Sequence, residues 1–363
     1  MAEIFSTWKM NHLELPNRLV RGATWEGLAD EGGMPGHDLI LKTAELAENG
    51  VGLVITGYAF IAPDGRGLPK QTGAHIDACV GPLARISDAV HKSGGKVALQ
   101  IVHAGGQTKQ AWTGHKPMGP SAIKHPAFGE EVEELTWDDI QDLVEDFAAA
   151  AGRARAAGFD AVELHGAHGY LINQFLSPNI NLRKDDYGGS LANRARFCHQ
   201  VYTAVRDAVG PEFPVFIKLN ADDAVEGGFG LAEAVEVAGT LSDQGIDGIE
   251  VSGGTPYSGK LSPSRVVKGA DEEGYFLEHA IAVKKAVSCP VISVGGWRSP
   301  QRITEALDQV DAVSLSRPFI REPGLAKRWA GGSLEPAACI SCGRCFVVTM
   351  KEGLGCAQEQ PKD

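Results

Sequence analysis

The chain has 363 residues, of which 43% are hydrophobic and 22% charged, as in a globular protein with a substantial core. This composition excludes a disordered chain and a small disulfide-rich scaffold. The formal net charge of −12, from 34 basic and 46 acidic residues, disfavours a dedicated binder of nucleic acid or of anionic membranes. Because no apolar run is long enough to cross a bilayer, and the first dozen residues lack the apolar core of a signal peptide, we expect a cytoplasmic protein.

Eight aliphatic segments recur along the chain and predict β-strands. Two of them, Val97–Val102 and residues 215–219, are aliphatic on both faces, which is typical of parallel strands covered on both sides. The eight segments are residues 18–24, 52–56, 96–103, 160–165, 214–220, 248–251, 290–294 and 311–316.

Segments with helical periodicity lie between most of the predicted strands. They include residues 39–48, 137–157, 192–209, 231–244, 278–288 and 300–309. Eight alternations of strand and helix without a break in composition favour a (β/α)8 TIM barrel over a doubly wound sheet. We expect the barrel to span residues 1–335, followed by a short Cys-rich C-terminal extension over residues 336–363.

Small or reactive residues follow each predicted strand, at the end of a barrel where active sites are built. Gly295 and Gly296 end the seventh strand, and Ser316 and Arg317 end the eighth. Glycines allow backbone N–H groups to approach an anion, and an arginine adds a charge-assisted contact. This pattern predicts a phosphate site, and the alternative is a glycine turn beside a surface arginine.

Two histidines and a tyrosine follow the fourth predicted strand. His165 and His168 are three residues apart, and Tyr170 comes two residues later. On spacing alone the pair could bind a metal ion, polarise a carbonyl group or serve only the structure, and these three interpretations remain open.

The segment that contains these residues resembles a known family. Residues 165–197, HGAHGYLINQFLSPNINLRKDDYGGSLANRARF, closely resemble the Old Yellow Enzyme family of FMN-dependent oxidoreductases, in particular its bacterial flavin reductase and 2,4-dienoyl-CoA reductase relatives. A weaker resemblance extends over the barrel, through residues 17–20, 99–101, 215–220, 295–296 and 317–318. Four residues of the same signature have expected structural roles in fixing the loop after the fourth strand: Arg183, Asp186, Tyr187 and Arg194.

The resemblance implies FMN at the C-terminal rim of the barrel. Gln100 would hydrogen-bond the pyrimidine part of the flavin, and Lys218 would lie near flavin N1 and the C2 carbonyl. A positive charge there stabilises the anionic reduced flavin. Other residues would line the ring or hold the phosphate: Ala23, Thr24 and Gly57 at the ring, and Gly295, Gly296, Ser316 and Arg317 at the phosphate.

The resemblance also implies how the substrate is held. His165 and His168 match the pair that hydrogen-bonds the substrate carbonyl oxygen, and Tyr170 matches the residue that delivers a proton to the α-carbon. Trp25 departs from the family, because an ungapped alignment places it where relatives carry Thr, Cys or His near the flavin C4 carbonyl. Either Thr24 substitutes there, or Trp25 packs near the ring and reshapes the substrate pocket.

Four cysteines crowd the C-terminal extension in the pattern C-x2-C-x2-C-x10-C, whereas Cys79, Cys198 and Cys289 are scattered and expected to be reduced core residues. Such an array can hold an iron–sulfur cluster or zinc. The dienoyl-CoA reductase and amine dehydrogenase relatives carry a four-cysteine cluster at the corresponding place, with slightly longer intervals. A [4Fe–4S] cluster, zinc and a metal-free motif therefore remain open at Cys339, Cys342, Cys345 and Cys356.

Our leading hypothesis is an NAD(P)H-dependent ene-reductase. NADH or NADPH would pass hydride to flavin N5, and an α,β-unsaturated enone or enal would then accept it in the same site, with ping-pong kinetics. The alternative is an iron–sulfur-linked flavoenzyme, similar to dienoyl-CoA reductase or amine dehydrogenase, with a separate electron partner.

Two further hypotheses concern binding more than chemistry. The cysteines could form a zinc-bound interaction or oligomerisation module on an ordinary reductase barrel. A non-catalytic flavin carrier is disfavoured, because it would need no His pair and Tyr at the ring. Since relatives often form dimers or tetramers, we also expect a homo-oligomer.

Overall fold

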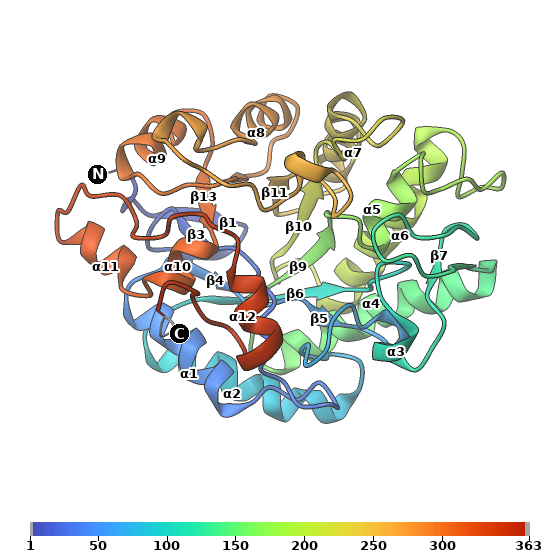
Figure 1. The fold of residues 1–363 in the computed structure, drawn as a ribbon, viewed down its shortest axis with the longest axis horizontal. Coiled ribbons are helices and arrows are strands. Elements are labelled where there is room, and N and C mark those ends of the chain that lie inside the picture. Colours follow the sequence, from blue (N-terminus) through green and yellow to red (C-terminus); the bar gives the residue numbers. More distant parts are fainter. Residues whose placement is uncertain (1–2, 360–363) are drawn as a thin grey trace.

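Eight parallel strands form a closed ring at the centre of the molecule. The structure, a computed structural model, describes residues 3–359. In that range the strands pair in sequence order, and β13 pairs with β3 to close the ring (Figure 1). Each predicted strand segment falls on one of them, so the (β/α)8 TIM barrel is confirmed. They are β3 (Leu19–Arg21), β4 (Leu53–Ile55), β6 (Val97–Val102), β9 (Ala161–Gly166), β10 (Val215–Asn220), β11 (Gly248–Ser252), β12 (Val291–Val294) and β13 (Ala312–Leu315).

Helices surround the barrel and cover its outer face (Figure 1). They are α1 (His37–Glu48), α2 (Val80–Lys92), α4 (Trp137–Ala156), α6 (Leu191–Val209), α7 (Leu231–Asp243), α8 (Leu277–Lys284), α9 (Pro300–Ala306), α10 (Arg317–Arg321) and α11 (Leu325–Ala330). The six predicted helical segments each fall on one of these helices, although α8 and α9 end earlier than predicted.

Shorter elements lie in the loops. They are β5 (Ala59–Phe60), β7 (Met118–Gly119), β8 (Glu133–Glu134), α3 (Gln110–Thr113), α5 (Leu171–Leu176), α12 (Cys345–Glu352) and the 3-10 helices η1 (Pro63–Gly65), η2 (Asp77–Cys79), η3 (Gly259–Leu261) and η4 (Ala270–Glu272). In the part of the chain that the structure describes, no helix is both long and apolar enough to span a bilayer.

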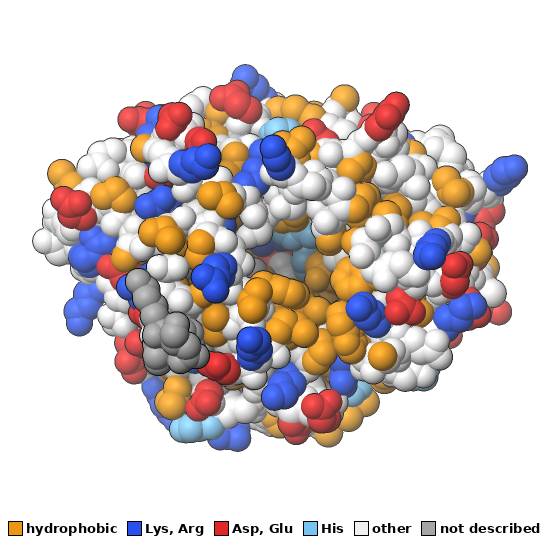
Figure 2. Space-filling view, viewed as in Figure 1, with side chains coloured by type: hydrophobic (Ala, Val, Ile, Leu, Met, Phe, Trp, Pro, Cys, Tyr) orange, Lys and Arg blue, Asp and Glu red, His pale blue; other side chains and the backbone are white. Residues whose placement is uncertain are grey.

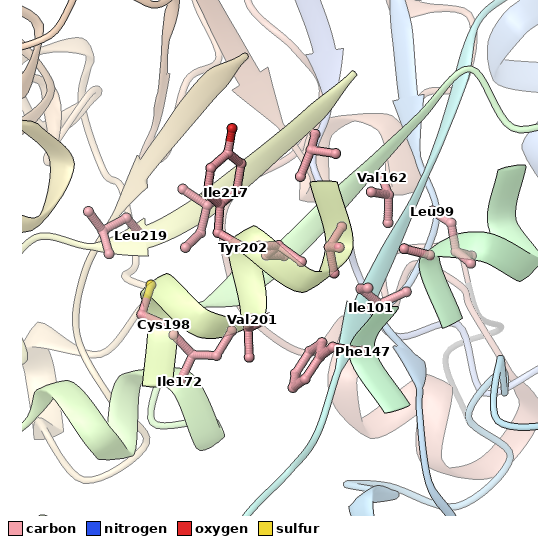
Figure 3. Close-up of a cluster of buried hydrophobic side chains, with 14 of the residues drawn as sticks. Leu99, Ile101, Phe147, Val162, Ile172, Cys198, Val201, Tyr202, Ile217 and Leu219 are labelled. Atoms are coloured by element: carbon pink, nitrogen blue, oxygen red, sulfur yellow. The ribbon is translucent and has the colours of Figure 1, made fainter. Parts of the chain in front are cut away.

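A large apolar core lies between the helices and the outer face of the barrel. Figure 3 shows Phe147 of α4 and Val201 of α6 among Leu99 of β6 and Ile217 of β10. Each fully buried side chain of this kind stabilises the fold by about 1.5–3 kcal/mol. Cys198 is part of the same core, and burial raises the pKa of its thiol to about 12, so the thiol stays protonated. The three scattered cysteines are free and buried, as predicted.

A β-hairpin closes the N-terminal end of the barrel. β1 (Trp8–Met10) and β2 (Leu13–Leu15) pair antiparallel, and their buried side chains pack among residues of the barrel interior such as Phe216. A Cβ added at Gly248, the first residue of β11, would lie 2.9 Å from the Met10 sulfur, so the hairpin touches the strand starts. Apolar side chains therefore fill the barrel interior at this end.

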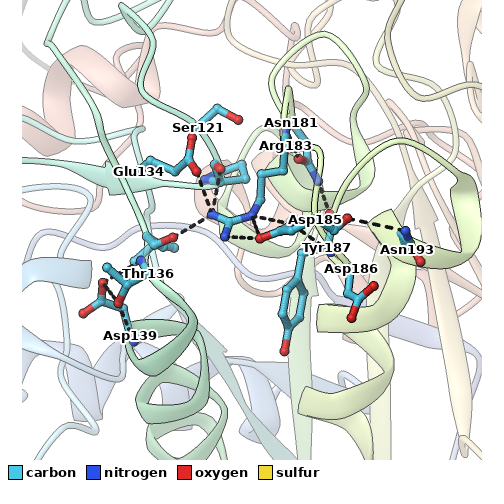
Figure 4. Close-up of polar contacts among 12 residues, drawn as sticks. Ser121, Glu134, Thr136, Asp139, Asn181, Arg183, Asp185, Asp186, Tyr187 and Asn193 are labelled. Atoms are coloured by element: carbon cyan, nitrogen blue, oxygen red, sulfur yellow. Dashed lines mark hydrogen bonds and ion pairs between the residues drawn. The ribbon is translucent and has the colours of Figure 1, made fainter.

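Arg183 fixes the long loop after β9, as the family signature implies (Figure 4). Its guanidinium pairs with the Asp185 carboxylate at 2.6 Å and donates to the carbonyl oxygens of Pro120 and Leu135. The loop after β9 is thereby tied to the loop after β6. Bidentate contacts of this kind are among the stronger hydrogen bonds in proteins.

The helices next to this loop begin at capping residues. The Thr136 hydroxyl accepts the N–H of Asp139, whose carboxylate accepts the N–H of Thr136, which forms a capping box at the start of α4. Ser190 accepts the N–H of Asn193 at the start of α6. Arg194, in the first turn of α6, donates to Glu233 of α7 and joins the two helices.

The C-terminal extension lies against the rim of the barrel (Figure 1). The N–H of Leu354 donates to the carbonyl of Glu26 at 2.8 Å, and the N–H of Ala337 donates to the carbonyl of Arg298 at 2.8 Å. The division into units of residues 1–335 and 336–363 stays a prediction, and residues 1–2 and 360–363 lie outside the described residues.

Trp8→Ala is expected to lower the free energy of unfolding by about 3–5 kcal/mol, because it empties the end of the barrel. Trp8 is 7% exposed, and its indole N–H donates to the Asn17 carbonyl at 2.8 Å. Urea unfolding followed by circular dichroism measures the change. The control is Lys9→Ala, whose side chain is exposed and makes only a surface ion pair, so its effect should stay within about 0.5 kcal/mol. Equal effects of the two variants would contradict a structural role for the hairpin.

Candidate active site

A cavity of about 680 Å³ opens at the C-terminal end of the barrel. Figure 2 shows the surface hollowed at the centre of this face, with histidine visible inside the hollow and hydrophobic side chains along one side. The volume falls within the range of about 300–1,000 Å³ that is usual for small-molecule sites. Many of the predicted site residues line it: Ala23, Thr24, Trp25, His168, Tyr170, Lys218, Gly296, Ser316, Arg317 and Cys345.

The other predicted cofactor residues lie just outside the lining. Gln100 is fully buried in β6, where its amide donates to the Glu163 carboxylate at 2.6 Å. The N–H of Gly57 donates to a Glu26 carboxylate oxygen at 2.6 Å. A Cβ at Gly57 would lie 1.8 Å from the other Glu26 oxygen, so the approach of this carboxylate explains the glycine.

The residues predicted to hold a phosphate come together at one side of the cavity. Gly295 and Gly296 both have positive φ, and a Cβ at Gly296 would lie 2.6 Å from a methyl group of Val267, so glycine is required there. The Ser316 hydroxyl hydrogen-bonds the Thr24 hydroxyl. Arg317 donates to the carbonyl of Ser341 in the extension at 3.1 Å, and so joins the extension to the barrel.

The two histidines and Tyr170 form an aromatic group at the end of β9. The rings of His165 and His168 lie 5.4 Å apart and nearly perpendicular, and the ring of Tyr170 lies 4.7 Å from that of His165. His168 has a φ of 60°, which is uncommon for a residue other than glycine and is found most often at functional sites. The Asn220 side chain accepts its N–H, and its Nε2 lies 2.6 Å from the Ser252 hydroxyl.

These three side chains are uncharged at neutral pH. Burial, aided by the charge of Lys218, lowers the pKa of His168 to about 3. Burial also lowers the pKa of His165 well below its ordinary value, with His168 and Lys218 adding to the effect. Burial raises the pKa of Tyr170, so its hydroxyl keeps its proton. The site therefore offers neutral N–H donors beside a protonated phenol, which suits a carbonyl oxygen.

Tyr58 belongs to the same group, although the sequence analysis gave it no role. It lines the cavity, and its ring lies 5.3 Å from that of Tyr170 and 5.9 Å from that of His165. Side-chain hydrogen bonds from Tyr58 and Gln107 lower the pKa of Tyr170 against the larger effect of burial. The signal that could have identified Tyr58 is its position directly after the second predicted strand.

Trp25 forms part of the cavity wall together with the C-terminal extension. Its indole N–H donates to the Pro69 carbonyl at 3.2 Å, and its ring lies 5.5 Å from that of Phe346 in α12. Phe346 and Thr349 also line the cavity. The extension therefore narrows the site, and Trp25 and Thr24 both face it.

The four cysteines of the extension do not form a recognisable metal centre. Burial first, and then the nearby Cys356, Cys339 and Cys342, raise the pKa of the Cys345 thiol to about 11. Within residues 3–359, however, no three or more His, Cys, Asp or Glu side chains are arranged to hold a metal ion. The expectation of iron–sulfur or zinc at these cysteines is therefore not supported.

The cavity fits FMN in shape and in chemistry. Its floor carries the Lys218 ammonium, and buried polar atoms without a partner among the described residues lie around it, including Gln100 Oε1, His165 Nδ1 and Ser314 Oγ. A Cβ at Gly22, which lines the cavity, would lie 2.4 Å from Ser314 Oγ, so the close approach of this hydroxyl explains the glycine. A polar floor beside a glycine-lined anion site suits a flat heterocycle that carries a phosphate.

Replacing His168 should make stability less sensitive to acid. Between pH 6.5 and about 3 the unfolded chain binds a proton at His168 that the folded chain does not bind, so stability falls as the pH falls through this window. His168→Gln removes this difference in proton binding, which is at most one proton. The slope of the free energy of unfolding against pH should therefore decrease by up to about 1.4 kcal/mol per pH unit. Urea unfolding at a series of pH values measures the slope.

Ser252→Ala is the matched control, because it removes the hydrogen bond of His168 but leaves the imidazole. In Ser252→Ala the slope of the free energy of unfolding against pH should be the same as in the unmodified protein. An unchanged slope in His168→Gln would contradict a buried neutral imidazole.

Comparison with known proteins agrees with this geometry. Residues 3–334 match the NADH:flavin oxidoreductase / NADH oxidase family. NADH oxidase from Thermoanaerobacter brockii is 36% identical over 93% of this chain, and the chain spans 52% of that protein, about half its length. NADPH dehydrogenase from Clostridium acetobutylicum is 34% identical over 88% of this chain and 92% of its own length.

A solved structure extends the comparison. The Old Yellow Enzyme homologue from Zymomonas mobilis matches with a TM-score of 0.78 and 26% identity, over 93% of this chain and 95% of that one. Together with the sequence matches, this likeness shows that the chain belongs to the NADH:flavin oxidoreductase / NADH oxidase family, within the Old Yellow Enzyme group.

Proposed function

We propose that the protein is an NAD(P)H-dependent FMN oxidoreductase that reduces the activated C=C bond of α,β-unsaturated carbonyl compounds. The observation that carries this proposal is the wall of a cavity with Lys218 at its floor. The neutral His168 and the protonated Tyr170 line this wall, and the ring of the neutral His165 lies next to both of them. The relatives named NADH oxidase and NADPH dehydrogenase support the nicotinamide donor.

The chain offers two sets of contacts for FMN. Bound FMN would supply the hydride transfer that links NAD(P)H to the substrate β-carbon. Five residues would hold the ring, and four others would hold the phosphate. These are Ala23, Thr24, Gly57, Gln100 and Lys218 for the ring, and Gly295, Gly296, Ser316 and Arg317 for the phosphate.

The side chains at the end of β9 would act on the substrate. His165 and His168 would each donate a ring N–H to the carbonyl oxygen, and so stabilise the negative charge that develops there as the β-carbon accepts hydride. Tyr170 would donate its phenolic proton to the α-carbon and recover a proton from solvent through the open cavity. Tyr58 would hold the Tyr170 hydroxyl in place. Assembly as a homo-oligomer and a place in the cytoplasm stay predictions.

The absorption spectrum of anaerobically purified protein tests this function directly. We expect flavin absorption that bleaches with NADH or NADPH and returns on addition of cyclohexenone, and parallel double-reciprocal plots, because donor and acceptor share one cavity. Absence of flavin bands even after FMN is supplied would contradict the proposal. A broad additional iron–sulfur absorption would instead favour electron transfer through the extension to a separate partner.

Tyr170→Phe should slow reoxidation by cyclohexenone by about 100-fold or more, because the α-carbon loses its proton donor. Reduction of the bound flavin by NAD(P)H should keep its rate, since that step needs no proton from Tyr170. Stopped-flow absorbance measures the two half-reactions separately. Tyr202→Phe, at a buried tyrosine outside the cavity, is the matched control and should change neither rate. Equal slowing of both half-reactions in Tyr170→Phe would argue against a proton-donor role.

A further inference from the structure

A cluster of buried ionisable groups lies beneath the cavity, and the proposed mechanism uses only one of its members. Lys218 on β10 pairs with Glu250 on β11 at 2.9 Å, and their side chains are 4% and 0% exposed. Glu163 on β9 is fully buried and accepts the amide of Gln100 on β6 at 2.6 Å. The strand register explains the arrangement, because Lys218 lies directly opposite Glu250 and Gln100 directly opposite Glu163.

The two carboxylates have unequal partners. Glu250 is ion-paired with Lys218, whereas Glu163 has no ion pair among residues 3–359. The other buried cation on the barrel strands nearby, Arg21, is already paired with Glu26 at 3.3 Å. A buried carboxylate without a cation is costly to ionise, and a second carboxylate nearby adds to that cost.

We propose that Glu163 carries a proton while Glu250 stays ionised, and that Glu250 is a positioning residue that holds Lys218 and limits the positive charge at the cavity floor. The second part of this proposal rests on the proposed function, because the floor is the expected place of the flavin pyrimidine ring. With Glu163 protonated, the cluster of Lys218, Glu250 and Glu163 is neutral. With both carboxylates ionised it would be negative and would oppose the charge of a reduced flavin.

Electrostatics agrees with the geometry. Burial, and then the charge of Glu250, raises the pKa of Glu163 well above its ordinary value. Burial acts to raise the pKa of Glu250 as well, but the charge of Lys218 and hydrogen bonds outweigh it and bring this pKa below the ordinary value. Burial lowers the pKa of Lys218, but the opposing effects, of which the charge of Glu250 comes first, bring it above the ordinary value, so its ammonium stays charged. The nearby His165 and His168 are neutral and leave this balance of charge unchanged.

Infrared spectroscopy tests the proton on Glu163 without any turnover. The protein as purified should show, at neutral pH, the C=O stretch of a protonated carboxylic acid that shifts on deuteration. Glu163→Gln should remove this band, whereas Glu133→Gln, at an exposed carboxylate in a surface ion pair, is the control and should keep it. A band that survives in Glu163→Gln would overturn the assignment.

The reduction potential of bound FMN tests the role of Glu250. The double variant Glu163→Gln/Glu250→Gln, in which Glu163 cannot ionise in place of Glu250, should leave the Lys218 charge uncompensated and tighten binding of reduced FMN relative to oxidised FMN at least tenfold, which is about 30 mV for a two-electron couple. Glu163→Gln replaces one neutral group with another and should leave the potential unchanged. Equal shifts in Glu163→Gln and in the double variant, or no shift in the double variant, would overturn the role of Glu250.

Failure to fold and failure to bind FMN can each be distinguished from failure of the proposal. If that double variant fails to fold because Lys218 is left unpaired, Lys218→Met/Glu163→Gln/Glu250→Gln removes all the charges of the cluster and should restore folding. The cluster of that variant has the same net charge as in the unmodified protein, so the relative binding of reduced and oxidised FMN should change less than tenfold, about 30 mV, and a larger shift would overturn the proposal. If the protein binds no FMN, the proposed function fails, whereas the infrared result still decides the protonation of Glu163.

Discussion

The ion pair of Lys218 and Glu250 is the interaction on which the arrangement of the barrel depends. A charge inside a barrel survives only where a partner satisfies it and where water and ligand can reach one side of it. Lys218 meets both conditions, because Glu250 lies on the next strand and the cavity lies above. The apolar hairpin β1–β2 fills the other end of the same interior. The barrel is thus divided along its axis into an apolar half that supplies stability and a polar half that supplies chemistry.

Much of the fold could be predicted from the sequence, because its signal is local. Parallel strands covered on both sides are aliphatic throughout, and small or reactive residues mark their ends, so all eight barrel strands were found. The hairpin was not predicted, because each of its strands has only three residues, such as Trp8–Met10, and alternation cannot be recognised over so short a run. α8 and α9 were predicted too long, because periodicity gives no sharp helix end.

Site residues that belong to one continuous sequence motif could be predicted. Those that come together only through the packing of different strands could not. His165, His168 and Tyr170 form one run of sequence and were identified together. Tyr58 lies in the loop after β4, Glu163 on β9 and Glu250 on β11, and only the closed ring brings these separate segments together. The spacing of the four cysteines suggested a metal, but spacing does not show how thiols are oriented, and the structure does not support that expectation.

The contact between the C-terminal extension and the cavity has a consequence for how such an enzyme can diversify. Phe346 of α12 packs on Trp25, and Arg317 holds the Ser341 carbonyl, so part of the wall comes from a segment that contributes no barrel strand. Substitutions in that segment can alter the size and polarity of the entrance while the buried charges beneath it stay in place. Sequence change at the extension can therefore alter which molecules enter the cavity without disturbing the Lys218–Glu250 ion pair.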